Sequence, residues 1–470
     1  MTSTKRVFLL HLFLIGIAAL STAWAQTLTG AWRGNIELPE APLAIGVTLA
    51  DGTDGLTGTI DIPAQGIDDL PLTDVARSGS NLTFGLQGVP GTPVFDGTVA
   101  GTGEAARITG DFTQSGQTFP FTLTRGVMEA AARPQEPQPP FPYRSEAVRF
   151  QNGEVMLAGT LTLPEGEGPF AAVLLITGSG PQDRDETIAG HKPFLLLADT
   201  LTRAGYATLR VDDRGVGGSS GDLNQATYDD LTGDVLAGIA FLRVHAAIAR
   251  ERIGLFGHSE GGYLAPLAAG RSDDVAFVMM MAGPAVSGEA VLLLQNRLIY
   301  EGLGLPEAQV EAQVAYIQQL STLLEQKNYE AAKVLSRKRI VAQYAALPEA
   351  QRPSPAEQEA AIEAQTTNSL ITPNFRAFVT YDPHPALEAL NVPVLAFYGG
   401  KDIQVPPQQS APVLRDILSD KADATVRVFP NLNHLMQPAT TGGFEEYAQI
   451  ETTLSPAVLE LVTSWLEARF

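Results

Sequence analysis

Hydrophobic and polar positions alternate in short runs between residues 27 and about 126. Every second residue tends to be apolar, and Gly, Asp, Asn or Pro separates the runs. A period of two puts successive side chains on opposite faces of a strand. Short strands at this spacing predict an all-β domain, either a small barrel or a sandwich. The clearest runs lie at 31–38, 43–50, 55–62, 81–87, 94–101, 106–113 and 118–125.

The pattern changes after a proline-rich stretch. Residues 127–143 contain few apolar side chains, and their prolines favour extended polyproline geometry, so we expect a semi-rigid linker. From residue 144 to 470, continuous apolar runs alternate with amphipathic segments, as expected for strands buried on both faces and for the helices that cover them. This alternation predicts an α/β domain with a mainly parallel sheet. The apolar runs lie at 170–180, 206–215, 252–259, 275–284, 392–400 and 425–431.

One block interrupts the alternation. Residues 285 to about 380 are polar and helical in pattern, without a buried strand. The simplest interpretation is a helical cap over the carboxyl edge of the sheet, where loops usually build sites. The alternative is a helical excursion that never approaches the site.

Residues 1–25 have the pattern of an export signal. Lys5 and Arg6 precede an apolar run from Val7 to Leu20, and Ala23-Trp24-Ala25 follows as a cleavage site. The apolar run is shorter than the ~20 residues of a membrane span. We therefore expect a signal peptide cleaved after Ala25, a secreted or periplasmic protein and no membrane attachment after cleavage. An uncleaved anchor is the alternative.

Composition narrows the chemistry. The 470 residues carry a formal net charge of −21 and contain no cysteine. The acidic balance argues against nucleic acid or an anionic membrane as partner. Without cysteine there can be no disulfide, thiolate metal site or cysteine nucleophile. No metal-ligand spacing such as His-Glu-x-x-His occurs, so we expect neither a metal nor an organic cofactor. Oligomeric state is left open.

The main chemical signal is Gly257-His258-Ser259-Glu260-Gly261. It follows a predicted strand and opens a predicted helix, which is the setting of a nucleophile elbow. Gly257 and Gly261 provide the small residues that so sharp a turn needs. Ser259 is the predicted nucleophile, and the backbone N–H of Glu260 is a predicted oxyanion donor at a helix N-terminus. His258 and Glu260 diverge from the serine on such a turn, so neither is expected to be its base or acid.

A serine hydroxyl needs a base, and an acid must orient that base. His434 lies in a loop after the last predicted strand, and Asp402 follows the preceding strand. This gives the chain order Ser, Asp, His that is typical of hydrolases built around a nucleophile elbow. Asp382 is a competitor for the acid, although an Asx-Pro turn is its plainer role. His191 and His384 are alternatives that pack elsewhere or line the site.

A second oxyanion donor is expected in the loop after the strand at 170–176. Gly178 and Gly180 let the backbone approach a substrate closely there, and either Ser179 or Gly180 is the predicted donor. The glycine-rich loop 212–222 lacks the Gly-Lys-Ser/Thr ending of a phosphate loop, so we interpret it as structural.

Six segments together resemble exported bacterial α/β-hydrolases of the serine-esterase kind, related to the prolyl-oligopeptidase-like and acyl-esterase branches. The segments are 177–186, 190–194, 209–221, 257–262, 398–406 and 431–437. The resemblance covers residues 144–470 and implies that Ser259, Asp402 and His434 are nucleophile, acid and base. The β region is similar to the lipocalin-like domains that precede some such hydrolases. Thr177-Gly178 stands where many relatives carry His-Gly, which leaves the second oxyanion donor open.

The expected function is therefore a carboxylic-ester hydrolase that forms an acyl-serine intermediate on small-molecule esters with short acyl chains. Two alternatives remain. One is a serine peptidase of the prolyl-oligopeptidase-like kind. The other is a binding protein whose β domain holds a glycan or partner while the hydrolase serves as scaffold.

Overall fold

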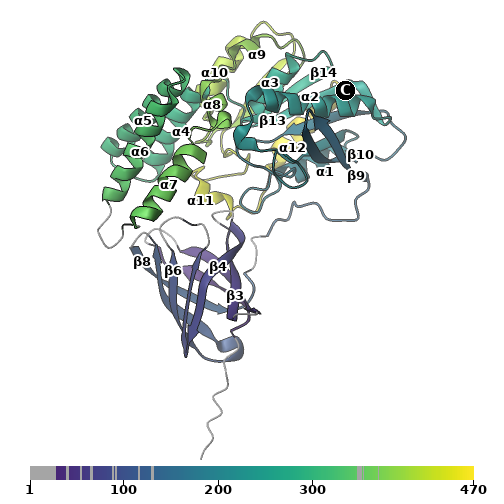
Figure 1. Cartoon of the computed structure of the whole chain (residues 1–470). Helices are drawn as coiled ribbons and strands as arrows, with labels where there is room; N and C mark the ends of the chain where they lie inside the picture. The colour runs from purple at the N-terminus through teal and green to yellow at the C-terminus, as the bar shows by residue number, and fades with distance from the viewer. Residues whose placement is uncertain are drawn as a thin grey trace, which may run out of the picture.

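Figure 1 shows the computed structural model of the chain. It describes residues 28–470 except 39–41, 53–54, 64–66, 87–88, 90–92, 115–116, 129–131, 347–351, 353 and 369. The predicted signal peptide, residues 1–25, lies outside the described residues. Among the helices of the described part, none is both long and apolar enough to cross a membrane.

The N-terminal strands form a closed antiparallel barrel. Each strand pairs with the next, and β8 returns to pair with β1. The alternating pattern explains this closure, because one face of every strand points into the barrel. The prediction of an all-β fold is confirmed, as a barrel rather than a sandwich. Its strands are β1 (Gly30–Ile36), β2 (Leu43–Gly52), β3 (Gly55–Ile62), β4 (Ile67–Ser78), β5 (Asn81–Leu86), β6 (Val94–Ala100), β7 (Arg107–Gln114) and β8 (Gln117–Arg125), with the short helix η2 (Gly103–Ala105) before β7.

Aromatic rings fill the barrel interior. Phe84 stacks on Phe95 with ring centroids 4.6 Å apart, and Phe121 meets Phe95 edge-on at 5.1 Å. The buried Trp32 indole lies under the Arg125 guanidinium, 4.0 Å from its carbon. A further part of the interior holds a cavity of about 220 Å³ with mostly apolar walls. The barrel therefore has a core of its own.

The second domain is built on an eight-stranded sheet in the order β16-β15-β14-β13-β11-β12-β10-β9. Strands β11 to β16 all run in the same direction, and β10 pairs antiparallel with β12 on one side and with β9 on the other. This is the mainly parallel sheet that the strand and helix alternation predicts, in the α/β-hydrolase arrangement that the family resemblance implies. The strands are β9 (Arg144–Asn152), β10 (Val155–Leu163), β11 (Phe170–Ile176), β12 (Ala207–Val211), β13 (Ile248–His258), β14 (Val275–Met281), β15 (Val394–Gly399) and β16 (Ala424–Phe429).

Helices cover both faces of this sheet (Figure 1), which explains why its central strands are continuously apolar. One face packs against α1 (Pro193–Arg203) and α12 (Pro456–Glu467). The other face packs against α2 (Tyr228–Val244), α3 (Gly261–Ala269), α9 (His384–Glu388) and α10 (Pro407–Ile417). The short helices η3 (Leu223–Gln225) and α11 (Phe444–Tyr447) lie in connections.

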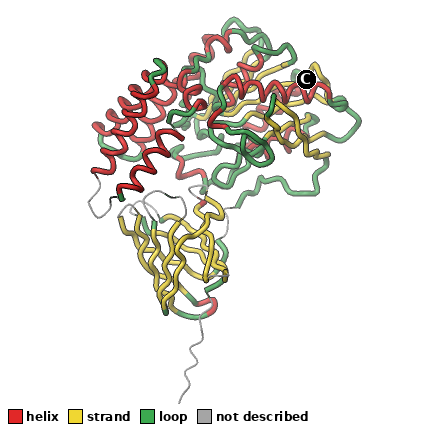
Figure 2. Tube along the Cα trace, viewed as in Figure 1, coloured by secondary structure: helices red, strands yellow, loops and turns green. Residues whose placement is uncertain are grey.

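Five helices between β14 and β15 form a separate group beside the sheet (Figure 2). They share a small core that includes Tyr316, Leu320 and Leu324. Because β14 delivers the chain to the carboxyl edge of the sheet, the group begins next to the nucleophile turn. These cap helices are α4 (Gly288–Gly302), α5 (Glu307–Glu325), α6 (Tyr329–Ala346), α7 (Pro355–Asn368) and α8 (Pro373–Thr380).

Residues 132–143 of the proline-rich stretch run along the α/β domain. The Arg133 guanidinium donates to the carbonyls of Ala189 at 3.0 Å and Ala448 at 2.9 Å. The Gln135 side chain donates to the Leu454 carbonyl at 2.9 Å. These bonds attach the connection to the second domain, so it behaves as part of that domain rather than as a free spacer.

Candidate active site

Ser259 lies on a strained turn between β13 and α3. Its φ of +51° is in the left-handed region, which few non-glycine residues adopt. A Cβ on Gly257 would lie 2.0 Å from the Gly261 carbonyl oxygen, and one on Gly261 would lie 2.3 Å from the Ile176 oxygen. The turn can therefore close only with glycine at both positions. The Ser259 N–H donates to the Met281 carbonyl at 2.9 Å and holds the turn against β14.

His434 and Asp402 form a buried pair at the same edge of the sheet. His434 Nδ1 lies 2.8 Å from Asp402 Oδ2. The other oxygen, Oδ1, accepts the N–H groups of Gln404 and Val405, both at 2.8 Å. These bonds fix the carboxylate, which in turn fixes the tautomer of the imidazole. His434 Nε2 has no hydrogen-bond partner among the described residues and is left to take up a proton.

The loop that carries His434 is clamped by its neighbours Asn433 and Gln437. The Asn433 side-chain amide donates to Gln437 Oε1 at 2.8 Å, and the Gln437 N–H donates to Asn433 Oδ1 at 2.9 Å. Both side chains are fully buried. The reciprocal bonds hold the loop in one shape, so the histidine is placed by the backbone as well as by its own partner.

The turn of Ser259 and the loop of His434 lie next to each other. The ring of His258, next to Ser259, lies 4.9 Å from the His434 ring between centroids. Ser259 lines the pocket together with Gln404 and Val405 from the Asp402 loop. The Ser259 hydroxyl and His434 are not hydrogen-bonded to each other in this structure. Catalytic hydrogen bonds often tighten only in the complex with substrate.

Backbone N–H groups without protein partners surround the serine. Neither the Glu260 N–H nor those of Ser179 and Gly180 have a hydrogen-bond partner among the described residues, and all three residues line the pocket of Ser259. The Gly178 N–H is already engaged, since it donates to Glu186 Oε1 at 2.7 Å. Gly178 is therefore removed as an oxyanion donor, and the choice between Ser179 and Gly180 stays open.

The pocket has a volume of about 300 Å³ and lies between the sheet edge and the cap. Val291 and Leu292 of α4 and Phe375 and Phe378 of α8 supply its apolar wall. The cap thus forms part of the site, and the alternative of a helical excursion away from the site does not describe these two helices.

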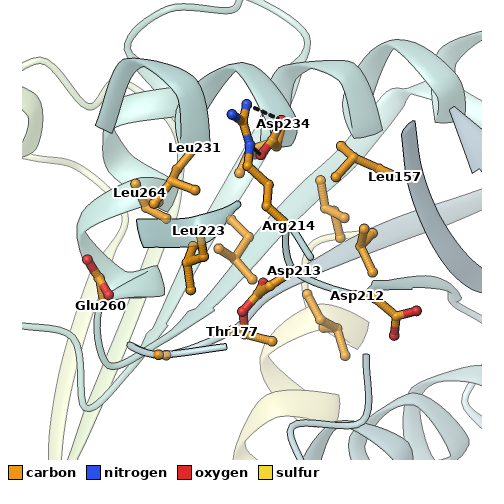
Figure 3. Close-up of a pocket in the computed structure, with 17 residues that line it drawn as sticks. Leu157, Thr177, Asp212, Asp213, Arg214, Leu223, Leu231, Asp234, Glu260 and Leu264 are labelled. Carbon is orange, nitrogen blue, oxygen red and sulfur yellow. Dashed lines mark hydrogen bonds and ion pairs between the residues drawn. The ribbon is translucent and has the colours of Figure 1, made fainter. Parts of the chain in front are cut away.

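A second, smaller cavity of about 70 Å³ lies behind the turn (Figure 3). Four carboxyl side chains line it, and desolvation raises the pKa of two of them, Asp213 and Glu260, to about 7. The Tyr228 hydroxyl donates to Glu260 Oε1 at 2.8 Å. Arg214, drawn in the same view, pairs instead with Asp234 at 2.6 Å. No basic side chain among the described residues forms an ion pair with Asp213 or Glu260.

The alternative candidates for the acid and the base have other partners. Asp382 and His384 pair with each other at 2.7 Å on the surface. His191 is buried and bonded to the Thr453 hydroxyl and the Tyr447 carbonyl, both at 2.9 Å, and burial lowers its pKa to about 4. Among the described residues, no group of three or more His, Asp or Glu side chains is arranged to hold a metal ion.

Sequence reasoning missed three groups at this site. Glu186 lies in a segment that carries the family resemblance, and Asn433 and Gln437 flank the predicted base, so their positions were a usable signal. No such sequence signal marked the cap residues Phe375 and Phe378, because periodicity does not say which helix of a cap faces the sheet.

Comparison with known proteins supports the fold. Residues 192–437, more than half of the chain, match the family model described as serine aminopeptidase, S33. Esterase EstD from Thermotoga maritima is 30% identical over 281 residues, which cover 60% of this chain and 58% of EstD. An uncharacterized 31.7 kDa protein of Escherichia coli is 32% identical over 108 residues, 23% of this chain and 35% of that protein.

Two solved structures match parts of this chain at low identity. The Pyrococcus furiosus esterase Pf2001 has a TM-score of 0.42 and 12% identity, and the match covers 73% of this chain and 99% of that chain. Dienelactone hydrolase from Anabaena variabilis has a TM-score of 0.37 and 16% identity, with 70% and 98% covered. On the match of its family model, the chain belongs to the serine aminopeptidase S33 family of α/β-hydrolases.

Proposed function

We propose that this protein is a serine carboxylic-ester hydrolase that acts through an acyl-serine intermediate. The observation that carries the proposal is that three features lie together at one edge of the sheet. These are the strained turn of Ser259, the bonded pair of His434 and Asp402, and N–H groups without protein partners. The 30% identity to esterase EstD, over 58% of that protein, supports an ester as the substrate.

In the proposed reaction His434 Nε2 takes the hydroxyl proton as Ser259 attacks the ester carbonyl carbon. The Glu260 N–H, with that of Ser179 or Gly180, donates to the tetrahedral oxyanion. His434 then returns the proton to the leaving alcohol. Water repeats the sequence on the acyl-serine and releases the acid, and Asp402 stabilises the imidazolium in both halves.

Short acyl chains fit the pocket best. Its volume of about 300 Å³ is at the small end of the range for ligand sites, roughly 300–1,000 Å³. Its apolar wall of cap residues gives an acyl or alkyl group a surface to pack on, and Asn224 and Gln295 add polar groups.

A peptidase is the second candidate, because the matching family model bears the name of a serine aminopeptidase. An alcohol leaves more readily than an amine, so an ester requires less of the site. Rates on p-nitrophenyl acetate, butyrate and laurate, set against aminoacyl p-nitroanilides, would decide between the two activities.

The experiment that tests the proposal compares the wild type with Ser259→Ala, using the exposed Ser419→Ala as a matched control. We expect the Ser259 variant to lose turnover of p-nitrophenyl acetate and labelling by a fluorophosphonate, while the control keeps both. Wild-type protein that neither turns over esters nor takes the label would favour the non-enzymatic binding role.

We also propose that the protein is exported, on the charge, apolar run and Ala-x-Ala pattern of residues 1–25. N-terminal sequencing of protein from the medium or periplasm should start at Gln26. A mature protein that starts at residue 1 or 2 in the cytoplasmic fraction would contradict the prediction.

A further inference from the structure

His258, the residue before the nucleophile, is fully buried and bonded through both ring nitrogens. Nδ1 lies 2.8 Å from Glu186 Oε1, and Nε2 lies 3.3 Å from the carbonyl oxygen of His434. An ionised carboxylate and a carbonyl are both acceptors without a proton to offer. Both ring nitrogens must then donate, which makes His258 an imidazolium. Burial alone would lower the pKa of His258, but the Glu186 carboxylate and the His434 carbonyl raise it above its usual value.

Glu186 connects this imidazolium to the other side of the site. The oxygen that accepts from His258 also accepts the Gly178 N–H at 2.7 Å. Gly178 immediately precedes the two candidate oxyanion donors. A single carboxylate oxygen therefore joins the oxyanion loop to the residue beside the nucleophile.

The loop that carries Glu186 holds an unfavourable backbone conformation to do so. Glu186 has a φ of +53° and a fully buried side chain. Such a conformation is energetically unfavourable and persists only where the surroundings impose it. Here the preceding turn imposes it, since the Asp183 side chain accepts the N–H groups of Asp185 and Thr187, both at 3.0 Å.

We propose that His258 is a positioning residue that, as an imidazolium paired with Glu186, ties the oxyanion loop and the His434 loop to the nucleophile turn. This inference rests on the proposed function. The ionisable residues around His258 are Glu186, His434 and Asp402. Glu186 bonds to the His258 ring through its carboxylate, and His434 bonds to it through its backbone carbonyl. His258 touches no reacting atom in this role. It sets where the oxyanion donors and the base stand relative to Ser259, and small misplacements of such groups are costly.

Two variants test the link. Glu186→Gln keeps an acceptor oxygen for Gly178 but removes the charge, so His258 becomes neutral and can donate through only one ring nitrogen, to residue 186 or to the His434 carbonyl but not to both. His258→Gln removes the link directly. For both variants we expect kcat on p-nitrophenyl acetate to fall about 10-fold to 100-fold, with KM little changed.

The double variant shows whether the two residues act as one unit. We expect it to lose no more kcat than the single variants, because neither residue has a function without the other. His245→Gln is the matched control, since His245 contacts Glu146 at 3.4 Å far from the serine, and it should keep wild-type kcat. A folded His258→Gln protein with wild-type kcat, or losses that simply add, would overturn the proposal.

A measurement on the wild type covers the case in which the variants fail to fold. Nitrogen NMR shifts of His258, identified by its contacts with His434, should show both ring nitrogens protonated at neutral pH. A neutral ring would refute the imidazolium. Fluorophosphonate labelling of the wild type separates a failure of the proposed function from a failure of the positioning role. If the wild type is unreactive, the proposed function fails; if it reacts and His258→Gln reacts equally fast, only the positioning role fails.

Discussion

Two histidine–carboxylate pairs lie side by side next to the nucleophile turn, and they differ in what the second ring nitrogen meets. In both pairs the nitrogen–oxygen distance is 2.8 Å and both partners are buried. Among the described residues His434 Nε2 has no protein partner, whereas His258 uses Nε2 to hold the His434 carbonyl. The same chemical pair can thus serve as a base when one nitrogen is open and as a fixed link when both are bonded.

The carboxylates differ as well. Asp402 accepts bonds on both oxygens, while Glu186 Oε2 has no partner among the described residues. A carboxylate that is hydrogen-bonded through both oxygens stays in place while its imidazole partner gains and loses a proton. One bonded through a single oxygen suits an imidazole whose charge never changes. The comparison predicts that substitutions in and around these two pairs have effects of different sizes on turnover and stability.

The largest effect should follow from removal of the open nitrogen. His434→Gln leaves Ser259 without a base, and we expect kcat to fall about a million-fold. Steady-state turnover of p-nitrophenyl acetate measures this, with His245→Gln as the control. A loss no larger than that of His258→Gln would mean that the two histidines have been assigned the wrong way round.

The next effect separates the two carboxylates. In Asp402→Asn an amide N–H can face His434 Nδ1, which favours the wrong tautomer and should lower kcat about 10⁴-fold. Glu186→Gln should cost far less, because it removes only a link. Equal losses of kcat in the two variants, measured at one pH, would contradict the different roles assigned to Asp402 and Glu186.

A third prediction concerns Glu260, a buried carboxyl near the serine that has no imidazole partner. Burial raises its pKa to about 7, so the folded state holds a proton that the unfolded state releases near its ordinary value of 4.5. Stability should therefore fall as pH rises from about 4.5 to 7 and then level off.

Glu260→Gln keeps the acceptor for Tyr228 and removes this titration. Urea unfolding should show the variant roughly 1–3 kcal/mol more stable than the wild type at pH 8, with the difference vanishing near pH 4.5. A stability difference that does not depend on pH would contradict the raised pKa.

The smallest effect should come from the region furthest from both pairs. Removing the barrel, residues 28–126, while keeping residues 132–143 preserves the bonds of Arg133 and Gln135. Turnover of p-nitrophenyl acetate should stay within about twofold of the full chain, because distant units act independently. A large fall would show that the barrel helps to shape the pocket.

The fold could be predicted from the sequence where one period dominated. Alternation marked seven barrel strands but not β4, which carries Pro71 and bends where Asp69 and Asp74 adopt a φ of +51°. The register shifts between Thr73 and Ala76, so a strict period of two does not run through the strand. Local bulges hide a strand from pattern analysis in this way.

The site was predictable where motif and fold agree. Ser259, Asp402 and His434 follow strand ends, and their chain order fixes where they meet. The position of Glu186 in a segment of the resemblance was a signal, but its role was not predictable, because that role depends on a loop that brings its side chain back to His258, 72 residues away. Contacts of that kind depend on loop conformation, which periodicity does not encode.

The attachment of the connection has a consequence for the reach of the barrel. Strand β8 ends at Arg125, and Arg133 is already bonded to the α/β domain, so a stretch of roughly eight residues spans at most about 28 Å. The connection therefore limits how far the two domains can move apart. A molecule long enough to touch both would meet the second at an effective concentration on the order of millimolar, whatever its concentration in solution.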